Sequence, residues 1–222
     1  MEASSVRTRR PGGGDGAATD PTAGTTAQDV RFVPSPLADP GPLGLAAFAL
    51  TTFVLSFFNA GLIKEGGEPV VFGLALAYGG LAQVLAGMWE FRTGNTFGAV
   101  AFTSYGAFWL SFWAYVQFYA AKVPEAQAGK AVGLYLIAWG IFTAYMFVAS
   151  LRTTGAIALV FILLTITFLL LGIGDAGPHT GITKLGGWFG LATAVAAWYA
   201  SFAGVTNATF GRVVLPVRPL RR

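Results

Sequence analysis

The residues of this chain that could carry acid–base or metal chemistry are few. The 222-residue sequence has no cysteine and a single histidine, His179, which excludes thiolate chemistry and any multi-histidine metal site. An enzyme needs converging acid, base or nucleophilic groups, and the only carboxylate well inside a long apolar segment is Glu90. We therefore expect no enzymatic activity, no metal site and no cofactor.

Uncharged hydroxyl and amide side chains recur along the apolar segments instead. Ser and Thr in a membrane helix often bond back to their own backbone, so each one alone indicates little. Directed together at the axis of a helix bundle, such groups can replace the water around a small polar solute, and neutral donors suit a small anion that must also leave. The residues that we expect to line such a path are Thr52, Asn59, Gln83 and Thr103, with Tyr78 as a further candidate.

Two polar residues stand where an apolar segment ends or begins. Glu90 has two interpretations: an interfacial side chain paired with nearby Arg92, or a functional group, since an ionisable residue within a membrane span is a functional candidate by default. Asn95, in RTGNTFG, is expected to cap the helix that follows. The free N–H groups at such a helix start attract anions.

The segments that must position these residues are membrane-spanning helices. Hydrophobic residues make up 55% of the chain and charged residues 11%, whereas soluble domains average about 25% charged residues. A spanning helix needs about 20 mostly apolar residues, and short polar separators make successive helices antiparallel neighbours. The composition predicts an all-α membrane protein, a bundle of six transmembrane helices, over residues 43–63, 69–91, 97–120, 131–151, 155–173 and 183–206.

The basic residues predict the orientation of this bundle. With the N-terminus inside, all ten arginines lie on the cytoplasmic side and all four lysines lie outside, which is the positive-inside bias of a plasma-membrane protein with both termini cytoplasmic. Residues 1–36 are poor in large apolar side chains, so we expect a disordered cytoplasmic tail. Residues 37–210 form the membrane domain, and 211–222 a basic cytoplasmic tail that anchors the topology. The net charge of +4 is spread over ends and loops, which argues against a nucleic-acid partner.

Small residues at helical spacing predict close helix packing. Gly186 and Gly190 form a GxxxG pair, and Gly79–Gly80 form a notch in the second predicted helix. Small residues let helix backbones approach in lipid. We favour packing within one protomer over contacts between protomers.

Four sequence blocks carry a resemblance to a known family. They are DPGPLGLAAFALTT from Asp39, YGGLAQVLAGMWEF from Tyr78, GNTFGAVAFTSYGAFW from Gly94 and FGRVVLPV from Phe210. In order and spacing they resemble the acetate uptake transporter family, the succinate–acetate permease group, over residues 39–217. That family's signature opens with Asn where this chain has Asp39. A carboxylate here would repel an anion if it lined the path, whereas Asp caps a helix as well as Asn does, and we favour the cap.

The resemblance implies a homohexamer with a pore through each six-helix protomer. It also implies passage of acetate and related short carboxylates through a Phe–Tyr–Leu constriction, which falls on Phe48, Tyr105 and Leu164. An apolar collar strips water from the solute, and a tyrosine hydroxyl supplies one donor to a carboxylate.

The expected function is therefore transport of acetate and related short-chain carboxylates, succinate among them, as channel-like anion passage. The absence of a chain of buried carboxylates or histidines favours a channel over a proton-coupled symporter, which remains the alternative. A membrane scaffold or sensor without transport activity is the alternative from another class.

Overall fold

The computed structural model describes residues 37–64, 66–177 and 179–220, and within those ranges the secondary structure is helical. The predicted disorder of residues 1–36 lies outside the described residues. The helices, in chain order, are α1 (Gly41–Asn59), α2 (Pro69–Leu76), the π-helical turn η1 (Ala77–Ala82), α3 (Gln83–Thr93), α4 (Thr96–Ala114), the π-helical turn η2 (Tyr115–Tyr119), the short 3₁₀ helix η3 (Ala120–Lys122), α5 (Glu125–Ser150), α6 (Gly155–Ala176) and α7 (Thr180–Phe210).

The six predicted spans correspond to these elements, with α2, η1 and α3 forming one continuous helix. Helix ends follow backbone geometry rather than hydrophobicity. Gly61, Gly94 and Gly211 have φ values of 73°, 79° and 62°, and this left-handed conformation, which glycine adopts without steric cost, ends a helix. For that reason α1 stops short of its predicted end and α7 continues to Phe210, beyond the predicted residue 206.

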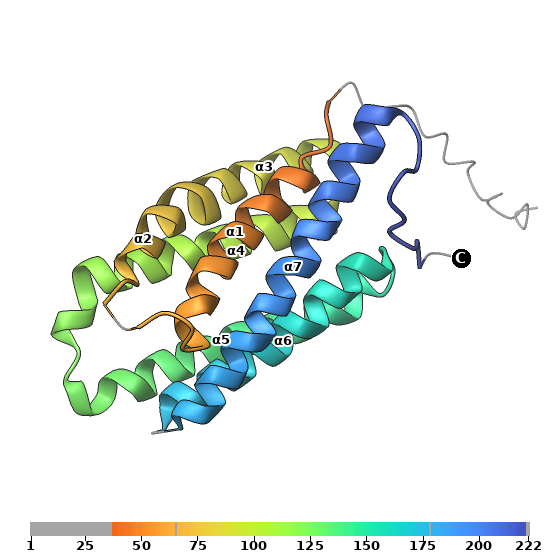
Figure 1. The fold of residues 1–222 in the computed structure, drawn as a ribbon. Coiled ribbons are helices and arrows are strands. Elements are labelled where there is room, and N and C mark those ends of the chain that lie inside the picture. Colours follow the sequence, from red (N-terminus) through yellow and green to blue (C-terminus); the bar gives the residue numbers. More distant parts are fainter. Residues whose placement is uncertain (1–36, 65, 178, 221–222) are drawn as a thin grey trace, which may run out of the picture. The chain divides into compact units, whose positions relative to one another are not determined.

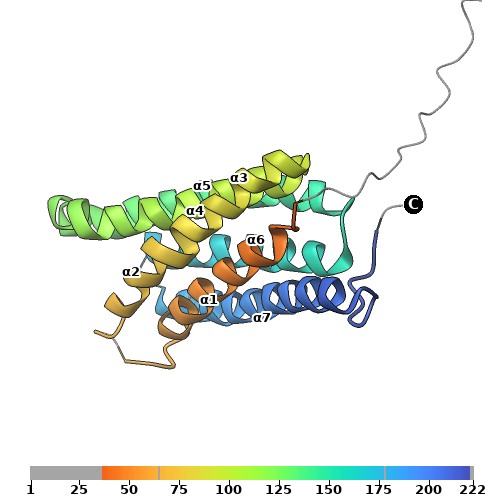
Figure 2. The same ribbon diagram turned by 90° about the horizontal axis from the view of Figure 1, so that it is seen from above.

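The helices pack as neighbours in an order set by the chain (Figure 1). Helices α1 and α7 run side by side in opposite directions, so that the start of α1 lies near the end of α7. Seen from above, α6 lies between α5 and α7 (Figure 2). The exception to the predicted adjacency is the pair α4 and α5, whose backbones approach each other far less closely. Aromatic rings fill the space between them, with Phe108 and Trp139 at a centroid distance of 5.3 Å.

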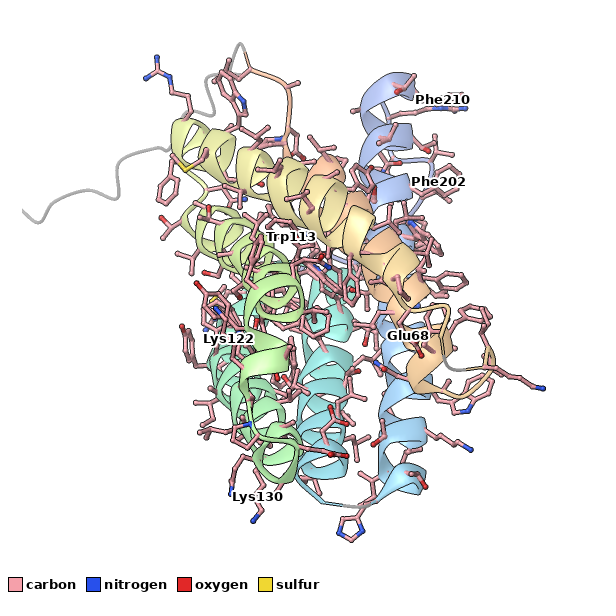
Figure 3. All side chains as sticks on the ribbon, turned by 90° about the vertical axis from the view of Figure 1, so that its left-hand side faces the viewer. Glu68, Trp113, Lys122, Lys130, Phe202 and Phe210 are labelled. Carbon is pink, nitrogen blue, oxygen red and sulfur yellow. The ribbon has the colours of Figure 1, made fainter. Side chains whose placement is uncertain are left out.

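Five helices of the described residues are long and apolar enough to cross a membrane: α1, the continuous helix Pro69–Thr93, α5, α6 and α7. Helix α4 is 19 residues long, but its Ser, Thr, Tyr and Trp residues reduce its mean hydropathy. The faces that these helices turn outward are apolar, as Phe202 and Phe210 on α7 illustrate (Figure 3), with 61% and 63% of their surfaces exposed. Such faces suit a lipid environment.

The predicted glycine contacts lie within the protomer. A Cβ atom on Gly79 would come within 2.6 Å of Thr51 Oγ1 on α1, and one on Gly186 within 2.8 Å of Leu171 on α6. A Cβ on Gly190 would overlap the hydroxyl of Ser56. The small residues therefore let α7 approach both α1 and α6, as predicted for packing within one protomer.

The C-terminal segment, predicted as a basic cytoplasmic tail, is hydrogen-bonded to the ends of α6 and α7. The Asn207 side chain accepts hydrogen bonds from the backbone N–H groups of Val214 (2.7 Å) and Leu215 (2.9 Å). The backbone N–H of Gly155, at the start of α6, donates to the carbonyl of Arg218 at 2.8 Å. The segment has backbone groups that need partners, and the ends of α6 and α7 supply them. Residues 212–220 are thus part of the helical unit.

Candidate functional site

Three cavities follow one another through the helical unit and share residues where they meet. The terminal cavity, of about 330 Å³, lies near the start of α1 and the end of α7. The central cavity is smaller, about 90 Å³. The loop cavity has a volume of about 800 Å³. It is lined by residues that follow α1, such as Gly61 and Lys64, and by residues between α6 and α7, such as Gly177 and His179. Phe48 and Leu164 border both the terminal and the central cavity, while Asn59 and Asp175 border both the central and the loop cavity.

The spacing of the lining residues explains why the cavities form one line. On α1 the lining positions include Leu45, Phe48, Thr52, Ser56 and Asn59, three or four residues apart. This spacing places side chains on a single face of an α-helix. Helix α6 repeats the pattern from its N-terminal to its C-terminal half, with Leu164 at the middle. One face of each helix therefore borders the whole line.

The three residues of the expected constriction come together at the junction of the terminal and central cavities. Phe48, Tyr105 and Leu164 have 5%, 3% and 3% of their surfaces exposed. The rings of Phe48 and Tyr105 lie 5.8 Å apart between centroids, and Tyr105 also contacts the rings of Phe142 and Phe161. An apolar collar of this kind separates two wider compartments.

The hydroxyl of Tyr105, which the sequence suggested as a donor to a carboxylate, is engaged within the protein in this structure. It donates a hydrogen bond to Thr143 Oγ1 at 3.0 Å. Thr143 cannot donate in return, because its own proton goes to the carbonyl of Trp139 at 2.7 Å. Because a hydroxyl has one proton, Tyr105 has none left for a carboxylate in this structure. Thr143 lies on α5, 38 residues further along the chain.

The environment of Glu90 differs from one of the two interpretations that the sequence allowed for this residue. Only 2% of its surface is exposed, and its carboxylate accepts a hydrogen bond from Thr93 Oγ1 at 3.1 Å. Among the described residues no ion pair joins it to Arg92, which is exposed. The interpretation of Glu90 as a solvated interfacial residue paired with Arg92 is therefore wrong. Glu90 lines the terminal cavity instead.

Asp39 lines the same cavity and lies close to Glu90. A Cβ atom on Gly41 would be 3.0 Å from Asp39 Oδ1 and 3.5 Å from Glu90 Oε1, so the two carboxylates flank one point of the chain. Asp39 Oδ1 also accepts a hydrogen bond from the backbone N–H of Gly41, the first residue of α1, at 2.8 Å. The two roles considered for Asp39, cap and lining residue, are therefore combined in one side chain.

The other predicted polar residues divide into two groups. Thr52 and Asn59 line the central cavity and Gln83 lines the terminal cavity. Asn95 caps α4, as predicted, by accepting a hydrogen bond from the N–H of Gly98 at 3.1 Å, and it borders the terminal cavity.

Thr103 and Tyr78 line none of the three cavities. The hydroxyl of Thr103 occupies the space where a Cβ atom of Gly87 would stand. It therefore belongs to the contact between α3 and α4. Tyr78 is half-buried in the π-helical turn η1.

Four residues that the structure places beside the predicted ones were not among those selected from the sequence. Phe161 packs against Tyr105, and Ser56, Trp109 and Asp175 line the central cavity. The signal for Ser56 was its position one helical turn after Thr52. Trp109 gave no such signal, because a tryptophan in an aromatic-rich helix is usually part of the core.

The sequence matches the model of the GPR1/FUN34/yaaH family over residues 23–222. It is similar to acetate permease A of Emericella nidulans, with 45% identity over 195 residues, which cover 81% of this chain and 65% of that protein. It is also similar to the succinate-acetate/proton symporter SatP of Escherichia coli, with 40% identity over 181 residues, 82% of this chain and 95% of that protein.

Among solved structures, the fold is similar to the structure of the bacterial acetate channel SatP. The TM-score is 0.76 at 40% sequence identity, and the match covers 82% of this chain and 99% of that one. The chain spans about two thirds of the length of the fungal permease, 65%.

Proposed function

This multi-pass membrane protein belongs to the GPR1/FUN34/yaaH family, and we propose that it carries acetate and related short-chain carboxylates across the membrane. The names of its relatives point to this substrate class: one is an acetate permease, one a succinate-acetate/proton symporter, and the solved structure an acetate channel. The proposed path is the line of three cavities, and its narrowest point is the collar of Phe48, Tyr105 and Leu164.

One observation carries the proposal: Phe48 and Leu164 border two cavities at once. Side chains that divide a line of cavities are where a solute must lose its water, and this makes them a selectivity barrier. The barrier is short, because Thr52 stands one turn beyond Phe48 on α1 and lines the central cavity. A carboxylate would meet polar groups again directly after the collar.

The lining favours channel-like passage of the anion. Thr52, Asn59 and Gln83, on the walls of the terminal and central cavities, are neutral. Neutral groups bind an anion weakly enough for it to leave, whereas a ring of fixed cations would retain it.

The test is uptake of labelled acetate into liposomes that contain the purified protein, at a pH well above the pKa of acetic acid, where diffusion of the neutral acid is small. We expect uptake above that of empty liposomes, and a change in its rate on substitution of Phe48. Phe202→Ala is the matched control, because Phe202 is exposed on the outer side of α7 and lines no described cavity. No uptake under any voltage or pH gradient would refute the proposal and favour a scaffold or sensor.

A second candidate mechanism, proton-coupled symport, is supported by the carboxylates of Asp39 and Glu90 beside the terminal cavity. Carboxylates are among the side chains that relay protons in transporters. The experiment that separates the mechanisms holds the membrane voltage fixed and removes the pH gradient. Unchanged acetate flux supports the channel. Strict dependence on the gradient, lost in Asp39→Asn together with Glu90→Gln, supports the symporter.

We propose further that both termini face the cytoplasm and that six protomers assemble. The topology is supported by the six spans predicted from the sequence and by the arginine and lysine distribution, and the hexamer by the family resemblance. Labelling of single cysteines introduced at residues 2 and 220 in intact cells tests the topology, since the natural chain has no cysteine. Native mass spectrometry tests the assembly.

A further inference from the structure

A carboxylate stands where the central cavity meets the loop cavity. Asp175, in the last turn of α6, lines both cavities and is half-buried. Among the described residues that line the central cavity, it is the only one with an ionisable side chain. Carboxylates in a pore favour the passage of cations. A carboxylate at this neck of the path, which Asp175 shares with Asn59, therefore needs an explanation in a protein that passes an anion.

No basic side chain neutralises Asp175. Within the described ranges it forms no ion pair, and its hydrogen-bonding neighbour is the neutral Thr183 on α7. Lys64 and Lys184 line the loop cavity but not the central one. The Lys184 side chain lies against Gly61, where a Cβ atom would be 3.0 Å from its Cε. The two lysines can attract an anion into the loop cavity, whereas an ionised Asp175 repels it at the neck.

The other ionisable groups around the neck lie further from the central cavity. His179 and Glu68 line the loop cavity only. The Glu68 carboxylate accepts a hydrogen bond at 2.7 Å from a backbone N–H of its own loop. On α5, a Cβ atom at Gly129 would come within 2.5 Å of the Asp175 carbonyl, and the neighbouring Lys130 is exposed. Asp175 is thus the ionisable group that an anion passes at the neck.

We propose that Asp175 is a proton-controlled electrostatic gate of the acetate path. When Asp175 is ionised, its charge opposes the anion at the neck. When it is protonated, the charge is removed and the carboxyl gains an O–H that can donate to the passing carboxylate. The proton comes from water in the loop cavity and returns there, and no bond of the solute changes. The inference rests on the proposed transport of acetate and assigns a regulation to it.

The position of the gate predicts from which side it responds to pH. The buried side chains of Phe48 and Leu164 lie between the terminal cavity and the central one. Asp175 lies beyond them and borders the loop cavity directly. Acidification on the loop-cavity side should therefore open the gate, and acidification on the terminal side should not. Because the proton is not carried across, flux follows the pH of one side rather than the gradient.

The test measures acetate current under voltage clamp in patches excised from giant spheroplasts that produce the full-length protein. All copies then have one orientation, and the cysteine labels at residues 2 and 220 identify the two faces. Diffusion of the neutral acid carries no current. With the acetate concentration held constant, acidification of the loop-cavity side from about pH 8 to about pH 5 should raise the current about tenfold, because one like charge close to the path is removed.

Three variants assign this response. Asp175→Asn keeps the shape of the side chain and an acceptor for Thr183, so its current should be as high as that of the acidified wild type and unmoved by acid. Asp175→Glu keeps a carboxyl and should retain the response. Glu125→Gln is the matched control, because it removes an exposed carboxylate at the start of α5 that lines none of the three cavities. It should respond as the wild type does.

The outcomes separate the gate from the transport on which it rests. An acid response in Asp175→Asn equal to that of the wild type overturns the gate. A response confined to the terminal side also overturns it and points to Asp39 and Glu90, which line the terminal cavity. A wild-type acetate current that no change of pH alters leaves transport standing and overturns the gate alone. Absence of acetate current from wild-type patches refutes the proposed function, and the gate with it.

Discussion

Replacement of Tyr105 by Phe distinguishes two roles for the hydroxyl in the collar. In the structure this hydroxyl donates to Thr143 Oγ1 at 3.0 Å, and Thr143 keeps its own bond to the carbonyl of Trp139 at 2.7 Å when the tyrosine hydroxyl is removed. The loss is therefore one neutral hydrogen bond, about 1 kcal/mol of folding stability. Acetate flux should stay within about twofold of the wild type, because a hydroxyl bonded to Thr143 gives no proton to the anion.

The opposite role predicts a much larger effect. A hydrogen bond from Tyr105 to a carboxylate in the collar would contribute about 1.5–3 kcal/mol, so its removal would reduce flux by roughly 10-fold to 150-fold. The assay is initial uptake of labelled acetate into liposomes with equal amounts of protein. Thr143→Val serves as the matched variant, since it removes the acceptor and leaves the tyrosine. A loss of tenfold or more in Tyr105→Phe, with normal thermal unfolding, would refute the reasoning and assign the hydroxyl to the substrate.

Three other predictions concern the collar, the buried carboxylate and a helix contact. Phe48→Ala should join the terminal and central cavities, lower stability by about 3–5 kcal/mol and raise uptake of butyrate relative to acetate; an unchanged ratio in transport assays would contradict the collar. Glu90→Gln should change stability by no more than about 1 kcal/mol, because Thr93 Oγ1 also donates to the Glu90 backbone carbonyl at 3.0 Å and keeps that acceptor when the carboxylate is replaced; a larger loss in thermal unfolding in detergent would show that the bond to the carboxylate dominates. Gly190→Ala should lower stability by about 1–3 kcal/mol because its Cβ would overlap Ser56, whereas Gly181→Ala, with nothing within 4 Å, should not; unfolding assays that rank the two alike would exclude this contact.

The helices were predictable because the hydrocarbon core of the membrane imposes both length and composition on a span. Their ends were less so. Helix α5 begins at Glu125, six residues before the predicted 131, because a helix continues past the apolar zone while its backbone conformation allows it. The π-helical turn at Ala77–Ala82 gives no hydropathy signal either. It follows from close contacts of Gly79 and Gly80 with α1 and α4.

The sequence could name candidate residues for the site but not the contacts that they make. The family resemblance indicated Phe48, Tyr105 and Leu164, and all three border the terminal cavity. That the Tyr105 proton is engaged by Thr143 depends on how α5 is placed against α4, which no local pattern encodes. The burial of Glu90 likewise depends on the Thr93 hydroxyl and on the approach of α1. A hydropathy profile registers one charged residue near a helix end and predicts solvation.

The alternation of polar and apolar zones along α1 shows how the proposed collar would select a solute without stopping its flux. At 1.5 Å per residue, Thr52 stands about 6 Å beyond Phe48 and Asn59 about 16 Å beyond it. Phe48 borders the terminal cavity on one side, and Thr52 and Asn59 line the central cavity on the other. The dehydrated stretch is thus about one helical turn, a small part of the roughly 30 Å hydrocarbon core. The cost of desolvating a charge rises with the length over which no polar partner is available. A collar one turn long, followed by the polar side chains of Thr52 and Asn59, limits that cost for a solute as short as acetate and imposes it twice on a solute with a carboxylate at each end.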